Sequence, residues 1–274
     1  MRHKKPFDIF LSIITRGAAI FAISILVFLI GYILFKGVPH LKPSLFAWNY
    51  NSENVSVVPA IITTVEMTLL ALVISVPLGV FTAIYLVEYA KRGNKVVGII
   101  RIATETLSGI PSIVYGLFGM LFFVTALGWG FSLIAGALTL SIMVLPLIMR
   151  TTEEALKSVP DAYREGAFGL GAGRLRTVFR IVLPAAVPGI LSGVILAIGR
   201  IVGETAALIY TAGTVAQIPK SLTDSARTLA IHMYNLSSEG LRTNEAYATA
   251  VILLVTVTGI NALAGYAAKK LVRR

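Results

Sequence analysis

The chain has 274 residues, of which 56% are hydrophobic and 14% are charged, and its formal net charge is +11. A soluble domain carries about 25% charged residues, so this composition excludes a soluble globular protein. The absence of cysteine excludes disulfides and thiolate metal sites. Because His3, His40 and His232 form no ligand spacing, we expect no metal, no cofactor and no catalytic residue.

Long apolar runs predict six transmembrane helices, since about 20 apolar residues cross a membrane. In chain order they cover residues 15–36, 60–88, 103–127, 131–149, 187–212 and 246–268. We expect the first run to remain as a span, because it is too long for a cleavable signal and lacks a small-residue cleavage site. The fold class predicted is an all-α integral membrane protein.

The distribution of positive charge predicts the orientation. Eighteen of the 24 lysines and arginines fall in the N-terminal arm, the second and fourth loops and the C-terminal tail. Both termini are therefore predicted to be cytoplasmic. The basic residues are spread over every cytoplasmic segment, which favours contact with anionic membrane lipid and gives no indication of nucleic-acid binding.

The outer loops divide the chain. Loop 37–58 separates residues 1–59, an arm with the first span, from a main membrane domain at residues 60–274 with a cytoplasmic loop at 150–186. The second outer loop, 213–245, has apolar residues at helical spacing. They are Leu222, Ala226, Leu229, Met233 and Leu236. This helix can lie on the membrane or plug the bundle, or it can dock an external partner.

The cytoplasmic loop has a shape of its own. Pro160 and Asp161 can start a short helix that Gly169 and Gly171 can end. A second short helix follows, with one apolar face. That face comprises Leu175, Val178, Phe179 and Val182. The first helix also carries aromatic side chains suited to a partner's groove.

This loop is similar to the signature cytoplasmic loop of ABC importer permeases: Glu-Ala-Ala, three residues, Gly, nine residues, Ile-x-Leu-Pro. The corresponding residues are Glu165, Gly166, Ala167, Gly171, Ile181, Leu183 and Pro184. Gly166 departs from the usual alanine, which should loosen the helix by roughly 0.5–1 kcal/mol. The resemblance implies a coupling helix that sits in a cleft of a separate ATP-hydrolysing subunit. A dinucleotide-binding loop is excluded because no strand precedes the glycines.

Two further stretches narrow the resemblance. Residues 104–116, Thr-Glu-Thr-Leu-Ser-Gly-Ile-Pro-Ser-Ile-Val-Tyr-Gly, and 199–206, Gly-Arg-Ile-Val-Gly-Glu-Thr-Ala, look like the phosphate-specific branch and its PstA-like subunits. The likeness covers about residues 60–268. It implies the type I importer fold and a hetero-oligomer in a bacterial or archaeal cytoplasmic (inner) membrane. The implied partners are a dimer of ATPase subunits, a second, PstC-like permease and an extracytoplasmic phosphate-binding protein.

The chain itself is not expected to be an enzyme. It contains no Gly-x-x-x-x-Gly-Lys-Ser/Thr sequence, so ATP hydrolysis is expected in a partner subunit. Two alternatives remain open. One is a permease for another oxyanion, such as sulfate or molybdate, and the other is a non-transporting membrane scaffold or sensor subunit.

Charged residues inside the spans are the candidate pathway residues. Arg200 and Glu204 are four residues apart, on one face of a predicted helix, so Glu204 is the expected partner of Arg200. A guanidinium can donate two parallel hydrogen bonds to an oxyanion. We expect Arg200 to bind phosphate transiently in the pathway, and Glu204 to hold the Arg200 guanidinium when phosphate is absent. The alternative is a purely structural salt bridge between the two residues. Glu105 is expected to pair with Arg101 in the same way.

Overall fold

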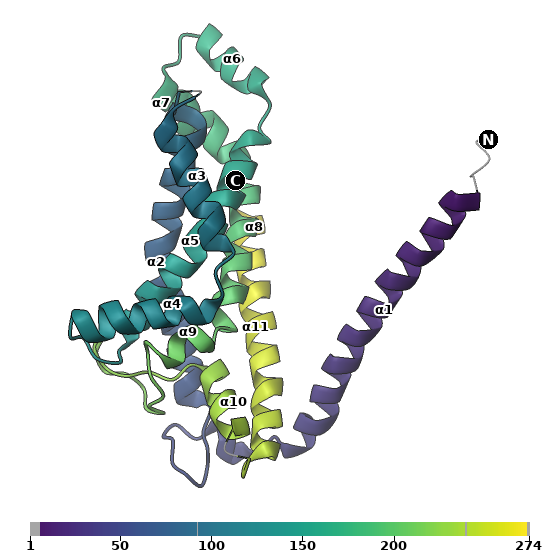
Figure 1. Cartoon of the computed structure of the whole chain (residues 1–274), viewed down its shortest axis with the longest axis vertical. Coiled ribbons are helices and arrows are strands. Elements are labelled where there is room, and N and C mark those ends of the chain that lie inside the picture. Colours follow the sequence, from purple (N-terminus) through teal and green to yellow (C-terminus); the bar gives the residue numbers. More distant parts are fainter. Residues whose placement is uncertain (1–5, 92, 239, 273–274) are drawn as a thin grey trace.

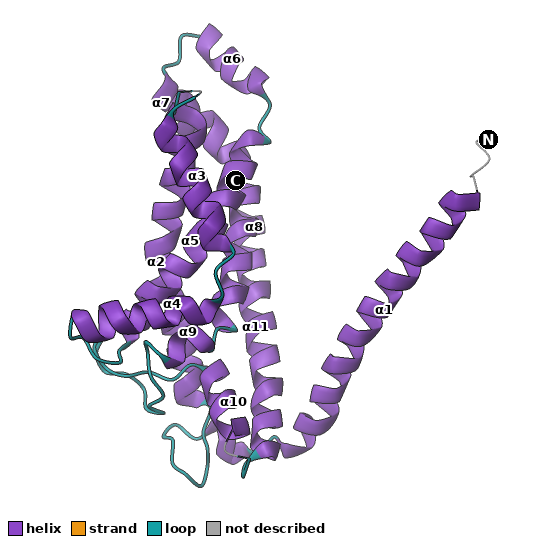
Figure 2. Ribbon diagram, in the orientation of Figure 1, coloured by secondary structure: helices purple, strands orange, loops and turns teal. Residues whose placement is uncertain are grey.

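Five long helices form the frame of the molecule. The computed structural model describes residues 6–91, 93–238 and 240–272, and the regular structure in these residues is entirely helical (Figure 2). The long helices are α1 (Pro6–Gly37), α2 (Val58–Ile84), α5 (Leu133–Lys157), α8 (Leu183–Val202) and α11 (Thr243–Val272). Each coincides over most of its length with a stretch long and apolar enough to cross a membrane. A π-helical turn, Tyr85–Tyr89, extends α2.

The span predicted at 103–127 is sharply bent. Two helices, α3 (Lys95–Ser108) and α4 (Ser112–Gly119), meet there at an angle of 104°, and Met120–Ala126 continues α4. Pro111 has no N–H to donate and disfavours helical geometry at Ile110, so the chain bends before α4 begins. In Figure 1, α4 runs across the long axis of the molecule. In the described residues, five continuous spans and one broken pair thus account for the six predicted spans.

The predicted span at 187–212 also ends too late. Helix α8 begins earlier, at Leu183, with Pro184 in its first turn, and it ends at Val202. Gly203 follows the helix, and a single turn, α9 (Ala206–Ile209), comes after it. A second break therefore lies within a stretch that is apolar enough to read as one span.

Short helices occupy the two ends of the bundle. At one end lie α6 (Asp161–Gly169) and α7 (Arg174–Thr177), and at the other lies α10 (Leu229–Ser238) (Figure 1). The predicted helix through residues 222–236 is wrong in its first half. There the Asp224 carboxylate accepts the backbone N–H groups of Lys220 and Ser221 at 2.8 and 3.0 Å and holds a turn.

The core lies where α2, α5 and α8 pack together. Met67 of α2 and Leu140 and Met143 of α5 are among its almost completely buried side chains. The Ser141 hydroxyl of α5 donates to the Ala71 carbonyl of α2 at 3.1 Å. Small residues allow this close approach, as is usual between membrane helices. The core holds the broken helices in place.

Helix α1 stands away from this core (Figure 1). It contacts α11, where the rings of Tyr32 and Tyr247 lie 6.0 Å apart, and most of its apolar side chains are exposed. Such a surface requires lipid or another helix to cover it. In Figure 1, the start of α1 and the last turns of α11 both lie toward the end that carries α6. The division at residues 59 and 60 stays a prediction.

Candidate translocation and coupling sites

Arg200 is a charged residue at the end of an apolar helix. It lies in the last turn of α8 and is partly exposed. None of the ion pairs found in residues 6–91, 93–238 and 240–272 involves Arg200. An arginine within the membrane costs about 3 kcal/mol on insertion scales, and a buried salt bridge would recover part of that cost. Within the described residues, no ion pair recovers this cost for Arg200.

Glu204 does not pair with Arg200, and the predicted pair is wrong. Because α8 ends at Val202, the two residues do not share a helical face. Glu204 is only 9% exposed, and its Oε1 accepts the backbone N–H of Ala207 at 3.0 Å. The carboxylate therefore satisfies an unpaired N–H at the start of α9. The sequence argument failed because it assumed that the helix continues through Gly203.

The two helix breaks are joined by direct packing of α4 on α9. A Cβ at Gly116 of α4 would come within 2.7 Å of the Ala207 Cα, so glycine is needed for this contact. Tyr115 is buried, and its hydroxyl donates to the Leu107 carbonyl at 2.7 Å, which ties α4 back to α3 across the bend. Tyr115 is also close enough to Arg200 for the positive charge of the guanidinium to act on its hydroxyl group. Broken helices that meet inside a membrane protein are typical of transporter binding sites.

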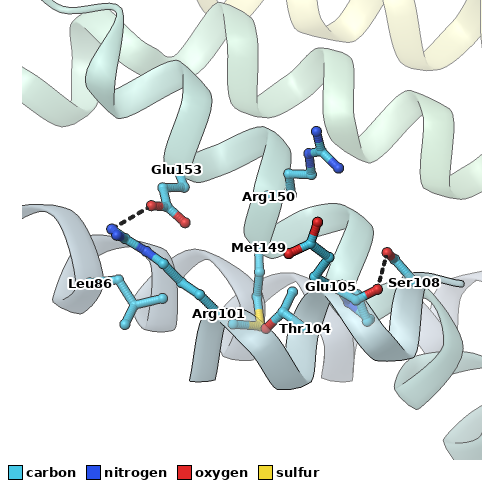
Figure 3. A pocket seen from close by; sticks show the side chains of 9 residues that line it. Leu86, Arg101, Thr104, Glu105, Ser108, Met149, Arg150 and Glu153 are labelled. Atoms are coloured by element: carbon cyan, nitrogen blue, oxygen red, sulfur yellow. Dashed lines mark hydrogen bonds and ion pairs between the residues drawn. The ribbon is translucent and has the colours of Figure 1, made fainter. Parts of the chain in front are cut away.

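A cavity of about 240 Å³ lies between α3 and α5 (Figure 3). Arg101 of α3 reaches Glu153 of α5 at 2.7 Å, and Lys157 contacts the same carboxylate at 2.6 Å. The predicted Arg101–Glu105 pair is therefore wrong: Arg101 prefers an acid on another helix. Glu105 lines the cavity, with Arg150 across from it (Figure 3).

The glycine-rich bend after α6 has a defined hydrogen-bond pattern. Helix α6 starts at Asp161 and ends at Gly169, as predicted. The Gly171 N–H donates to the Phe168 carbonyl at 2.9 Å, and the Ala172 N–H to the Ala167 carbonyl at 3.0 Å. These two bonds form a Schellman motif, which requires a left-handed residue at Gly171, where φ is +80°. The glycine of the loop signature is thus the residue that ends the helix.

Helix α6 presents one face to solvent and one to the bundle. Tyr163, Phe168 and Leu170 are exposed, Leu170 by 92%, whereas Ala167 is buried. Glu165 and Gly166 are exposed, and a Cβ added at Gly166 would meet open space. The exposed face is a surface to which another protein can bind.

The second half of the loop signature leads into α8. Ile181 and Leu183 are half-buried, and Pro184 is exposed in the first turn of α8. Of the predicted apolar face, Val178 and Val182 are buried, but Leu175 and Phe179 are 66% and 40% exposed. That prediction was half wrong because α7 has only four residues and a π-helical turn, Val178–Val182, follows it.

Sequence reasoning missed two residues that tie elements together. Tyr115 lies in the stretch 104–116, which was noted for its family resemblance and not for a contact. The Gly109-Ile-Pro111 sequence before it could have signalled the size of the bend. Arg164 of α6 turns away from solvent toward α2, which no local pattern reveals, because its partner Glu88 is 76 residues away.

Comparison with known proteins agrees with this architecture. Residues 75–274 match the family described as binding-protein-dependent transport system inner membrane component. The probable ABC transporter permease protein YqgI of Bacillus subtilis strain 168 is 37% identical over 244 residues, which cover 82% of this chain and 81% of that protein. The phosphate transport system permease protein PstA of Mycobacterium leprae strain TN is 36% identical over 205 residues, covering 74% and 67%.

A solved structure supports the same fold. A bacterial alginate ABC transporter, in complex with an alginate pentasaccharide-bound periplasmic protein, contains a chain that superposes with a TM-score of 0.65 at 17% identity. The match covers 95% of this chain and 97% of that one. The fold and the junction of broken helices thus define a permease of the type I ABC importer class. The chain belongs to the family of inner membrane components of binding-protein-dependent transport systems, and it is a multi-pass protein of the cytoplasmic membrane.

Proposed function

We propose that this chain is a permease subunit of an ATP-driven phosphate importer and forms half of the translocation pathway. The observation that carries the proposal is the junction of α8, α9 and α4, where Arg200 has no acidic partner among the described residues. The similarity to PstA of Mycobacterium leprae supports phosphate as the substrate.

Arg200 binds phosphate transiently during passage. Its planar guanidinium matches a tetrahedral oxyanion through two parallel hydrogen bonds. Glu204 acts indirectly, by fixing the turn of α9 that packs on α4. Because no acid among the described residues pairs with Arg200, an entering anion does not have to displace one. A weak, exposed contact of this kind also lets the anion leave.

The energy comes from partner subunits. ABC importer permeases work with separate ATPase subunits and an extracytoplasmic binding protein. Here the exposed face of α6, with Tyr163 and Phe168, docks into the ATPase, and Glu165, Gly166, Ala167 and Gly171 set its shape. Ile181, Leu183 and Pro184 join this segment to α8. The remaining partners are a PstC-like second permease and a phosphate-binding protein.

The positive charge of the loops supports a cytoplasmic location for α6 and for both termini. The outer end then carries α10 and the loop before it. Residues 1–59 supply an additional span, and residues 60–274 form the permease domain with its coupling loop at 150–186. This orientation places α6 where ATP is available.

The test is radiolabelled phosphate uptake into proteoliposomes that contain the complete complex. We expect ATP-dependent uptake that unlabelled phosphate abolishes and that a hundredfold excess of sulfate or molybdate leaves intact. Competition by sulfate or molybdate would assign another oxyanion. Absence of any ATP-dependent uptake by an assembled complex would support a scaffold or sensor subunit instead.

A further inference from the structure

The inner face of α6 is fixed by one side chain, Arg164. Its side chain is 15% exposed, and that of its partner Glu88, in the π-helical turn that extends α2, is 8% exposed. The neighbouring Tyr163 is 53% exposed. Helix α6 therefore offers aromatic residues to a partner on one face and a buried cation to the membrane helices on the other.

The Arg164 guanidinium makes hydrogen bonds to three parts of the chain. Nη2 lies 2.6 Å from Glu88 Oε1, and Nε donates to the same oxygen at 3.2 Å. Nη2 also donates to the Leu156 carbonyl at 3.0 Å, and Nη1 to the Val159 carbonyl at 2.8 Å. The last carbonyls of a helix have no partner within it, so Arg164 caps the end of α5 while it holds α2.

The chemistry of this contact is specific to arginine. Only a guanidinium presents donors in a fixed fork that can bind a carboxylate and carbonyls at once. The hydrogen bond that Arg164 donates to the Glu88 carboxylate raises the pKa of the guanidinium above its ordinary value, so the cation stays charged. Asp161, at the start of α6, adds a fourth acceptor at 3.1 Å.

A second contact links the same segment to the same end of α2. The guanidinium of Arg174, at the start of α7, lies over the ring of Tyr89, 5.7 Å from its centre. Beneath these contacts, Leu156, Val159 and Val178 pack with Ile84 of α2. These contacts join α6 and α7 to α2 and α5, which form the centre of the core.

We propose that Arg164 is a positioning residue that transmits movement of α6 to α2 and α5, with Glu88 as its counterpart on α2. The inference rests on the proposed function, because it presumes that α6 docks into an ATPase. A residue that only stabilises the fold would change the amount of complex. A transmitting residue changes the ratio of ATP hydrolysed to phosphate carried.

The experiment measures that ratio for the purified complete complex in proteoliposomes. Arg164→Lys keeps the charge and loses the fork, and Glu88→Gln keeps the shape and loses the charge. For both we expect the ATPase rate to stay within about twofold of wild type while phosphate uptake falls, so that the ratio rises at least about fivefold. Glu154→Gln, which breaks the exposed Arg150–Glu154 pair of the same region at 3.1 Å, is the matched control and should leave the ratio unchanged.

Three results would overturn the inference. They are an unchanged ratio in both variants, a parallel loss of hydrolysis and uptake, or failure of both variants to assemble. Each would assign Arg164 a purely structural role. A wild-type complex that hydrolyses ATP without carrying phosphate would instead refute the proposed function, so the two failures can be told apart.

Discussion

The arginine at the junction of α8, α9 and α4, Arg200, and the arginine of α6, Arg164, have opposite hydrogen-bond environments. Arg164 donates to a carboxylate, two carbonyls and a second acid, whereas no ion pair in the described part of the chain includes Arg200. A fully bonded cation fixes one geometry. An unpaired cation is costly but free to bind a passing anion. The comparison teaches that rigid transmission and transient binding need different hydrogen-bond environments.

The largest effect is expected at the unpaired cation. Arg200→Ala should lower phosphate uptake by about 100-fold, equivalent to about 2.7 kcal/mol, because a charge-assisted bidentate contact is lost. Arg200→Lys should retain an intermediate rate, since the charge remains and the fork is lost. Uptake by the reconstituted complex measures both, and exposed Arg176→Ala is the control. Uptake by Arg200→Ala at the wild-type rate would remove Arg200 from the pathway.

The next largest effect is expected in the coupling segment, at the bend that ends α6. Gly171→Val forces a β-branched residue into the left-handed conformation at φ +80°, at a cost of about 1–2 kcal/mol. The bend should open, and uptake should fall about tenfold while the complex still assembles and hydrolyses ATP. Gly169→Ala has open space around it and no left-handed requirement, so it should behave as wild type. Equal uptake by the two variants would refute a role for the bend in coupling.

A smaller effect distinguishes the two possible roles of Glu204. Glu204→Gln keeps an oxygen that can accept the Ala207 N–H, so uptake should stay within about threefold of wild type. Glu204→Ala leaves that N–H unpaired, at about 1–3 kcal/mol, and should lower uptake further. A large loss with Glu204→Gln would mean that the negative charge matters and would restore the pairing with Arg200.

The smallest effect concerns a third cation, Arg227, at the end of the molecule that carries α10. Arg227 lies 4.7 Å from the centre of the Tyr50 ring and is buried near His232. Burial, and then the Arg227 charge, lower the pKa of His232 from 6.5 to about 3. The unfolded chain then binds a proton that the folded chain does not, so stability is full above pH 6.5 and falls as the pH drops toward 3.

Between pH 7.5 and 5.5 this loss is about 1 kcal/mol, or a few degrees in the melting temperature. Thermal unfolding of the purified complex at the two pH values measures it. His232→Leu should show a smaller difference between the two melting temperatures than wild type. An identical difference would mean that His232 is not the group responsible.

The coupling segment was largely predictable because its conformation is local. Pro160 and Gly171 fix the start and end of α6 through their own backbone preferences. The exposure of Gly166, Leu175 and Phe179 was not predictable from the local sequence. Which residues of a short helix face solvent depends on the elements that pack against it. The partner of Arg164 could not be predicted, because Glu88 lies on a distant helix.

The membrane junction was less predictable for a related reason. Hydropathy gives the apolar length of a segment and not the position or size of a break within it, so residues 103–127 and 187–212 were each predicted as one span. Pro111 signals a kink, but neither the 104° angle there nor the end of α8 before Gly203 follows from the apolar pattern. The pairing of charges by sequence spacing failed twice, at Arg101 and at Arg200, since both predictions assumed that the nearest acid in the sequence is the partner.

One measurement tests the central claim most directly. The complete complex, trapped with phosphate and a non-hydrolysable ATP analogue, can be imaged by cryo-electron microscopy. The unpaired-cation account predicts tetrahedral density within about 3 Å of the Arg200 guanidinium, with Glu204 still bonded to the Ala207 N–H. Phosphate density elsewhere in the pathway, together with a direct Arg200–Glu204 ion pair, would contradict it.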